Sequence, residues 1–214
     1  HEIVYLGDFF DLYCISRFDK DPRQNFLQVK DEIAEGIELI SEIEKISKAK
    51  SFVFIEGNHE QRVEKYLNAY GGMLRDLVQE PKDILSIPTH YKWFPYGQKN
   101  YYRMEKDLVA THGTVTNKHP TYGMLQKLGC SVIFGHTHKL QEVHVVQLGS
   151  KTLRGFNAGW LGDMPQAAEY IKDTADWTLG FASGLFRKSG HWDINLHSII
   201  KYSTTYGDRF YDAA

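Results

Sequence analysis

Cysteine is scarce in this chain of 214 residues, and its scarcity excludes one class of small secreted protein. Only Cys14 and Cys130 are present. Two cysteines this far apart in the sequence are too few for a disulfide scaffold, and they fit a reducing compartment. We interpret both as small apolar residues rather than as nucleophiles.

The sequence also lacks a long apolar run, an excess of one charge and an internal repeat. No run approaches the roughly 20 apolar residues that cross a bilayer. The net charge is −2, so no global positive field favours a nucleic-acid or membrane-surface partner. No fixed-period repeat or low-complexity segment stands out. We therefore expect a soluble cytoplasmic protein without a membrane partner.

Apolar side chains, in contrast, are plentiful enough for a substantial core. Hydrophobic residues make up 42% of the chain, and the length suits one domain, which we expect over residues 1–214. Four short apolar runs, rich in β-branched or aromatic residues, predict buried strands. These runs are 3–6, 52–55, 108–110 and 131–134.

The segments between these runs favour helices in the first half and hairpins in the second. Apolar residues at spacings of three or four predict an amphipathic helix over 25–48. Shorter helices are expected over 61–68, 73–79 and 122–128. Alternation of strands and helices indicates a layered α/β architecture. The pattern after Gly135 is typical of hairpins, over 143–156 and 178–199. The aromatic-rich stretch 85–100 either plugs the sheet edge or lines a pocket.

Each predicted strand is followed by a turn whose side chains can donate a lone pair. The turns are Gly7-Asp8-Phe9-Phe10-Asp11, Gly57-Asn58-His59-Glu60, Thr111-His112-Gly113 and Gly135-His136-Thr137-His138. Singly, such residues are usually helix caps, turn residues or hydrogen-bonded structure. Strand carboxyl ends form one rim of an open α/β sheet, where ligands bind, so we expect these groups to converge. Carboxylate, amide and imidazole groups together predict a metal site.

In their order, the segments GDxxD, GNHE, His-Gly and GHTH resemble the calcineurin-like metallophosphoesterase family, with features of phage and bacterial members. The resemblance covers about residues 3–164. If a phage encodes the protein, we expect it in the host cytoplasm. It implies a layered α-β-β-α sandwich, with mixed sheets flanked by helices and a β-rich second half. It also implies a hydrolase, a phosphatase or phosphodiesterase, in which a hydroxide bridging two divalent metal ions attacks a phosphomonoester or phosphodiester. We expect manganese in this dinuclear centre, with Fe, Zn or Ni as alternatives.

The resemblance further implies which residues bind the two metal ions. Asp8 matches the carboxylate that bridges them. Asn58, His112 and His136 match the ligands of one ion. His138 matches a ligand of the other ion.

The remaining motif residues are expected to act on the substrate or to support the site. His59 matches the catalytic histidine, which does not bind metal and would act as a general acid. The resemblance gives Asp11 and Glu60 no settled role. One of them orients His59, or each of them supports the metal ligands. Arg62, one helical turn after Asn58, either clamps a phosphate oxygen or belongs to a solvated helix face.

Two residues outside the motifs are further candidates for contact with the phosphate-ester substrate. His119 follows His112 closely, where substrate would enter, and we expect it to bind substrate. Trp160 lies in the glycine-rich segment 155–163. That segment is either a simple backbone turn or one that lets Trp160 stack on a nucleobase.

One part of the family pattern, a DxH motif on a strand before GDxxD, is missing. We expect the sequence to begin after this motif, so that the domain lacks its first strand and helix. The alternative is an inactive binding module with the same fold. A second alternative is a nuclease acting on DNA or RNA, which would need a local basic track. Candidates for that track, interspersed with acidic residues that argue against it, are Arg17, Lys20, Arg23, Lys118, Lys139 and Arg187.

Overall fold

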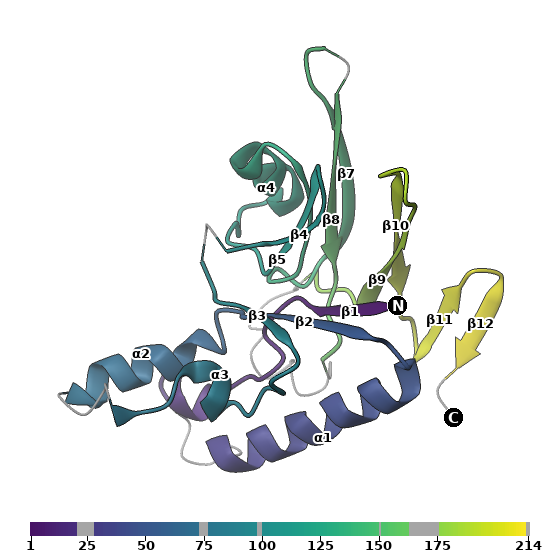
Figure 1. Cartoon of the computed structure of the whole chain (residues 1–214). Helices are drawn as coiled ribbons and strands as arrows, with labels where there is room; N and C mark the ends of the chain where they lie inside the picture. The colour runs from purple at the N-terminus through teal and green to yellow at the C-terminus, as the bar shows by residue number, and fades with distance from the viewer. Residues whose placement is uncertain (21–27, 73–76, 98–99, 150, 163–175, 213–214) are drawn as a thin grey trace. The chain divides into compact units, whose positions relative to one another are not determined.

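The computed structural model describes residues 1–20, 28–72, 77–97, 100–149, 151–162 and 176–212 (Figure 1). They form two compact units, His1–Tyr102 and Arg103–Ala214, which are described one at a time. Both units combine strands with helices, so the predicted mixed α/β class and the β-rich second half are confirmed. A single domain over 1–214 stays a prediction. Within the described residues, no helix has the length and apolarity needed to cross a bilayer.

A three-stranded parallel sheet forms the centre of the first unit. Its strands are β1 (Glu2–Tyr5), β2 (Ser51–Ile55) and β3 (Lys92–Phe94), in that order. The register of β1 and β2 pairs Ile3 with Phe52 and Tyr5 with Phe54. Because the two strands are parallel and in this register, the turn after β1 emerges beside the turn after β2.

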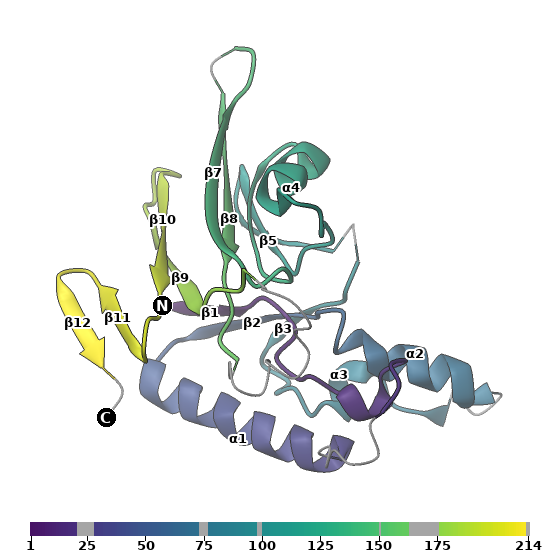
Figure 2. The same cartoon turned by 180° about the vertical axis from the view of Figure 1, so that it is seen from behind.

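The described part of the first unit holds one 3₁₀ turn and three α-helices. They are η1 (Tyr13–Ile15, a 3₁₀ turn), α1 (Val29–Ser47), α2 (Gln61–Tyr70) and α3 (Pro81–Ile84). Helix α1 runs alongside the sheet in both views (Figures 1 and 2). Its apolar stripe, which includes Ile33, Ile37 and Ile40, packs into the core. Positions 25–27 and 73–76, where we predicted further helix, lie outside the described residues.

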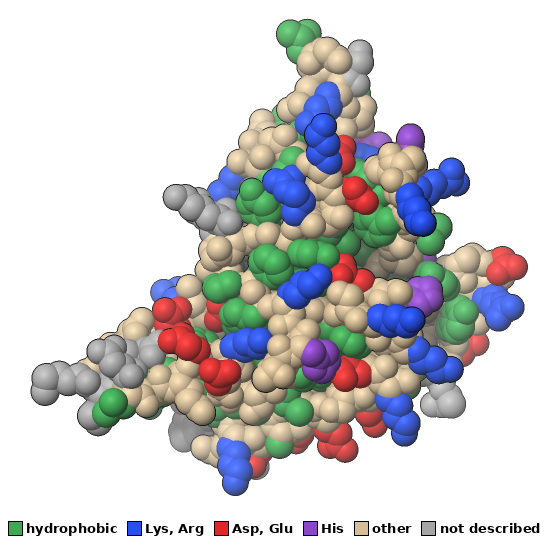
Figure 3. Space-filling model, in the orientation of Figure 1, with side chains coloured by type: hydrophobic (Ala, Val, Ile, Leu, Met, Phe, Trp, Pro, Cys, Tyr) green, Lys and Arg blue, Asp and Glu red, His purple; other side chains and the backbone are tan. Residues whose placement is uncertain are grey.

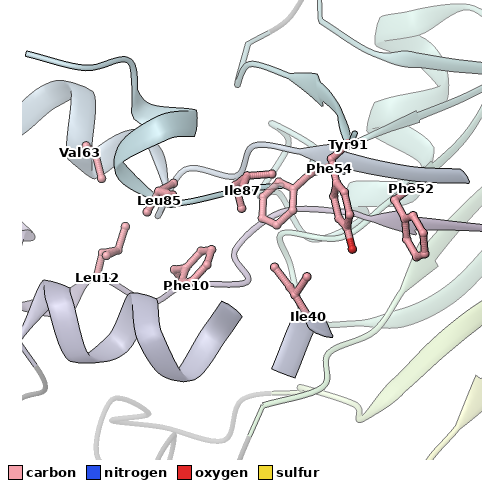
Figure 4. Packing of buried hydrophobic residues seen from close by; sticks show 9 residues of the cluster. All are labelled: Phe10, Leu12, Ile40, Phe52, Phe54, Val63, Leu85, Ile87 and Tyr91. Atoms are coloured by element: carbon pink, nitrogen blue, oxygen red, sulfur yellow. The ribbon is translucent and has the colours of Figure 1, made fainter. Parts of the chain in front are cut away.

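Aromatic residues make up four of the nine buried residues in the core cluster of the first unit (Figure 4). Tyr91 stacks on Phe52 with ring centroids 4.9 Å apart, and Trp93 stacks on Phe54 at 5.3 Å. Tyr91 and Trp93 belong to the stretch 85–100, so these two aromatics pack on the sheet, as the first interpretation of that stretch predicts. Burial of each large apolar side chain contributes about 1.5–3 kcal/mol.

A five-stranded sheet, in the order β4-β5-β6-β8-β7, forms the second unit together with helix α4. Strands β5, β6 and β8 are parallel, whereas β7 and β8 make the predicted hairpin. Helix α4 packs on β6, β7 and β8. The elements are β4 (Tyr102–Glu105), β5 (Leu108–Thr111), α4 (Pro120–Leu128), β6 (Ser131–Phe134), β7 (Leu140–Val146) and β8 (Thr152–Ala158).

Residues at each end of α4 explain its bounds. Pro120 occupies the first turn, where a missing N–H costs nothing. Gly129 ends the helix with φ 65°, and its N–H donates to the carbonyl of Leu125 at 2.9 Å. A left-handed glycine of this kind is a common helix stop.

Two antiparallel hairpins complete the second unit. Strands β9 (Gly180–Phe186) and β10 (Trp192–Ser198) form the hairpin predicted over 178–199. Strands β11 (Ser203–Tyr206) and β12 (Arg209–Asp212) form a second hairpin that the sequence analysis did not predict. On the face drawn in Figure 3, side chains of both charges are interspersed, as the net charge leads one to expect.

Candidate metal and catalytic site

Glu60 ties together the two turns that follow β1 and β2. Its fully buried carboxylate accepts four backbone N–H groups, from Asp8 at 2.9 Å, Phe9 at 2.7 Å, Phe10 at 3.0 Å and Gly57 at 2.8 Å. Hydrogen bonds to an ionised acceptor are about twice as strong as those between neutral groups. Glu60 therefore organises the loop that carries Asp8. Of the two roles left open for Glu60, these hydrogen bonds favour support of a predicted metal ligand.

The side chain of Asp8 accepts a hydrogen bond from the turn after β2. Its Oδ1 accepts from the N–H of His59 at 2.9 Å. The approach is so close that a Cβ on Gly57 would lie 2.2 Å from Oδ1 of Asp8 and 2.3 Å from its backbone nitrogen. Only glycine leaves this space. The turns after β1 and β2 thus converge, as the sequence predicts for this pair.

Asp11 holds the ring of His59. Nδ1 of His59 lies 3.1 Å from Oδ1 of Asp11, so an N–H at Nδ1 donates to the carboxylate. This tautomer leaves Nε2, which lies 3.8 Å from Oδ2 of Asp8, as the nitrogen that can exchange a proton with another group. Asp11, not Glu60, is therefore the residue that orients His59.

Arg62 supports the same carboxylate. Its Nη1 donates to Oδ1 of Asp11 at 3.1 Å and also to the main-chain oxygen of Asp11. With 13% of its side chain exposed, Arg62 does not belong to a solvated helix face. Burial opposes ionisation of Asp11, but the hydrogen bond and charge of His59, together with Arg62, outweigh it and lower the pKa of Asp11.

Glu56, which the sequence analysis did not single out, is a buried acid at the end of β2. One oxygen, Oε2, accepts from the N–H of Tyr96 at 2.7 Å, and Oε1 has no hydrogen-bond partner among the described residues. Burial raises the pKa of Glu56 to about 7. The only sequence signal for this group was an acid that directly follows an apolar strand.

In the second unit, the turns after β5 and β6 also converge in a pair. The register of the parallel strands sets Thr111 opposite Phe134, so His112 and the turn 135–138 follow side by side. Nε2 of His112 lies 3.0 Å from Nδ1 of His136. His112 is only 1% exposed. Two imidazole lone pairs at this distance repel each other unless a proton or a cation lies between them.

Three of the predicted metal ligands have a left-handed backbone. The φ angles are 54° for Asp8, 68° for His136 and 57° for His138. This conformation is uncommon for residues other than glycine, although Asp and His adopt it more readily than most. It costs on the order of 1–3 kcal/mol per residue and is concentrated at functional sites. The backbone thus aims these three side chains in directions that an ordinary turn would not.

His138 packs between two tryptophans. Its ring stacks on Trp160 with centroids 5.5 Å apart and meets the edge of Trp177 at 4.2 Å. The N–H of Thr178 donates to the carbonyl of His138 at 2.8 Å, which fixes the turn. Trp160 therefore lies beside a predicted ligand. Trp177 was missed because it belongs to none of the motifs.

Asn157, after Glu56 and Trp177, is a third residue that was not singled out from the sequence. It is fully buried on β8, and its Nδ2 donates to Oγ1 of Thr137 at 2.6 Å. Its Oδ1 has no hydrogen-bond partner among the described residues. Asn157 holds the turn that carries His136 and His138, a role that only the pairing of β6 with β8 reveals.

The donors of both units fit divalent metal ions by their chemistry. The first unit offers the carboxylate of Asp8 and the amide of Asn58, and the second unit offers imidazoles. Two neighbouring ligands at about 2.1 Å from an ion, at right angles, would lie about 3 Å apart. The nitrogens of His112 and His136 have this separation, 3.0 Å.

His119 is the predicted substrate residue that the structure places outside both pairs of turns. It is exposed and precedes α4 as its N-cap residue, and its N–H donates to Oδ1 of Asn117 at 3.0 Å. Its expected contact with substrate stays a prediction.

Comparisons with known proteins found relatives in two mycobacteriophages. The Gene 54 protein of Mycobacterium phage L5 is 27% identical over 197 residues, which cover 85% of this chain and 75% of the relative. The Gene 54 protein of Mycobacterium phage D29 is 28% identical over 213 residues, which cover 89% and 78%. No family model and no solved structure matches the chain. The relatives suggest a phage origin, and their names state no activity.

Proposed function

We propose that this protein hydrolyses phosphate esters with the help of two divalent metal ions. The observation that carries the proposal is the pairing of strand-end turns within each unit. Asp8 meets the turn of Asn58 and His59 in the first unit, and His112 meets His136 in the second. In each unit, two turns with metal-binding side chains lie against each other. This arrangement favours metal binding over a separate structural role for each turn.

Both sets of donors are proposed to bind the same two ions. Asp8 would bridge them, Asn58, His112 and His136 would bind one, and His138 would bind the other. When bound, such ions neutralise charge on the phosphoryl oxygens and make an attacking water more acidic. The finer fold expected from the resemblance, the layered α-β-β-α sandwich, is part of the same proposal, as is manganese as the metal.

His59 is proposed to protonate the leaving oxygen of the ester. Asp11 accepts from Nδ1 and so presents Nε2, while Arg62 keeps the Asp11 carboxylate ionised and in place. A positioned general acid of this kind contributes about 10² to 10⁴ in rate. Asp8 lies on the same side, since its Oδ2 is 3.8 Å from Nε2 of His59.

Hydrolysis of p-nitrophenyl phosphate and bis-p-nitrophenyl phosphate tests the proposal. We expect the chain with added MnCl₂ to hydrolyse at least one of them, and EDTA to abolish the reaction. His59→Ala should slow it about 10² to 10⁴-fold.

His144→Ala is the matched control, because His144 also pairs with a carboxylate, 2.5 Å from Oε1 of Glu142, but lies outside the four turns. Its rate should equal that of the wild type. Failure to hydrolyse either ester with Mn, Fe, Zn or Ni would instead support an inactive binding module.

A further inference from the structure

A groove of about 550 Å³ lies on the first unit, between the segment 14–18 and helix α2. Its volume suits a ligand of nucleotide size or larger. One end of it is lined by Asn58, a proposed metal ligand. The other end is lined by the last turn of α2. The lining residues combine cations with aromatic rings: Arg17, Arg62, Lys65, Phe18, Tyr66 and Tyr70.

The cations of the groove are local, which explains why the net charge did not reveal them. Arg62 is held in place by Asp11. The wall that carries Arg17 is also fixed, because Nζ of Lys20 donates to Oγ of Ser16 at 3.0 Å and to the carbonyl of Phe18 at 2.7 Å. Arg17 and Lys20 belong to the basic track considered from the sequence, and Arg23 lies outside the described residues.

The aromatic residues of the groove expose their rings instead of burying them. Tyr66 is 45% exposed and Tyr70 is 76% exposed. They lie one turn apart on α2, with ring centroids 4.7 Å apart. Exposed rings beside cations are the arrangement that binds single-stranded nucleic acid, since bases stack on the rings and Arg or Lys binds the phosphates.

The length of the groove favours a polymer over a single nucleotide. From Asn58 to Tyr70 the chain advances twelve residues, mostly helical, which at about 1.5 Å per residue spans roughly 18 Å. Successive stacked nucleotides are about 3.4 Å apart, so several fit along this distance. A strand in the groove would lead one of its phosphodiesters to Asn58 and His59.

We propose that this groove binds single-stranded nucleic acid and thereby sets the substrate class of the site, a polynucleotide phosphodiester. The cleavage step rests on the proposed function, but the binding step does not. Duplex should bind less well, because paired and stacked bases cannot present their faces to Tyr66 and Tyr70.

Fluorescence anisotropy tests the groove without any cleavage. Fluorescein-labelled oligo-dT and oligo-rU of twelve nucleotides are titrated with the chain in EDTA, and a twelve-base-pair DNA duplex serves as competitor. We expect binding of at least one single strand and weaker competition by the duplex. The preferred sugar distinguishes DNA from RNA. Absence of binding by both single strands, or tighter binding of the duplex, would overturn the proposal.

Substitutions then locate the binding surface. Tyr66→Ala combined with Tyr70→Ala should weaken binding about fivefold or more, whereas Tyr66→Phe, which keeps the ring, should not. Tyr202→Ala is the matched control, because Tyr202 is 71% exposed in the second unit and should leave affinity unchanged. Equal affinity of the double variant and the wild type would remove the groove from consideration.

Salt dependence tests the contribution of the cations. Lys65→Ala should lower the slope of log affinity against log salt by about one, as expected for one lost phosphate contact. Lys45→Ala, which removes an exposed lysine from α1 in the same unit, should leave the slope unchanged. Identical slopes for Lys65→Ala and the wild type would show that this lysine contacts no phosphate and would contradict the proposed path of the strand.

The same preparation separates this inference from the proposed function. Hydrolysis of bis-p-nitrophenyl phosphate without oligonucleotide binding would overturn the groove and leave the phosphoesterase. Oligonucleotide binding without hydrolysis of any ester would support the groove and overturn the phosphoesterase.

Discussion

The turns of the first unit are held by hydrogen bonds, whereas the histidines of the second unit face each other nitrogen to nitrogen. Glu60 accepts four backbone N–H groups, and Asp8 accepts a fifth. Nε2 of His112 and Nδ1 of His136 lie 3.0 Å apart, and a contact of this kind needs a shared proton or cation. Backbone hydrogen bonds therefore preorganise the first set of side chains, and we expect a bound cation to stabilise the second set.

The largest expected effect is that of a substitution in the second unit on hydrolysis and on stabilisation by metal. His136→Ala should abolish hydrolysis and the rise in Tm that MnCl₂ produces, because it removes one of the facing nitrogens. Saturation at about 100 times Kd stabilises a protein by about 2.7 kcal/mol. Thermal melts with and without MnCl₂ measure this, with His144→Ala as the control. An unchanged metal-induced rise in His136→Ala would contradict the difference between the units.

Substitution of Glu60, in contrast to His136→Ala, should lower the stability of the metal-free protein. Glu60→Ala leaves four backbone N–H groups without their acceptor, so we expect the free energy of unfolding in EDTA to fall by about 3 kcal/mol. Urea denaturation followed by tryptophan fluorescence measures this fall.

Glu60→Gln keeps one acceptor oxygen and should lose less than Glu60→Ala. Glu42→Ala, on the exposed face of α1, should be close to neutral. A loss for Glu60→Ala no larger than that for Glu42→Ala would show that the network does not hold the turns.

Asp11→Asn probes how the first unit presents His59. The amide cannot accept from Nδ1 with the strength of a carboxylate, so the ring loses its preferred orientation. We expect kcat to fall about tenfold, less than for His59→Ala, with KM for the small esters little changed. An equal fall for Asp11→Asn and His59→Ala would mean that Asp11 does more than orient the ring.

The smallest effect concerns the pH dependence of stability. The pKa of Asp11 is lowered by its neighbours, so its contribution is present above the pKa of the unfolded chain and is lost as the pH falls through the folded value. The carboxylate is 49% exposed, so we expect less than about 1 kcal/mol. Wild type should exceed Asp11→Asn in unfolding free energy at pH 7, and the difference should shrink as the pH falls through the folded pKa of Asp11. A difference that grows on acidification would mean that folding raises the pKa of Asp11 and would contradict this prediction.

The sequence predicted the elements whose burial leaves a clear pattern. Strands β2, β5 and β6 are short apolar runs of mostly buried residues, and the stripe on α1 repeats every three or four residues. Strand β1 is a similar run, but none of its residues is fully buried, so that part of the prediction is wrong. The hairpin of β11 and β12 was missed because it is largely exposed, so its composition carries no burial signal. The short helix α3 was missed because four residues show no period.

For the candidate site, the residue types were predictable and their mutual roles were not. The motifs identified Asp8, His59, His112 and His136. That Asp11 orients His59 while Glu60 ties the loops depends on which N–H groups point at each carboxylate. Spacing along the chain does not encode those directions.

Crystals grown with MnCl₂ and measured for anomalous scattering give the most direct test of a shared dinuclear centre. We predict two anomalous peaks, one bound by Asn58, His112 and His136, the other by His138, with Asp8 between them. A chain that binds manganese at neither cluster, or in which Asp8 and the His112–His136 pair bind separate ions far apart, would contradict the account.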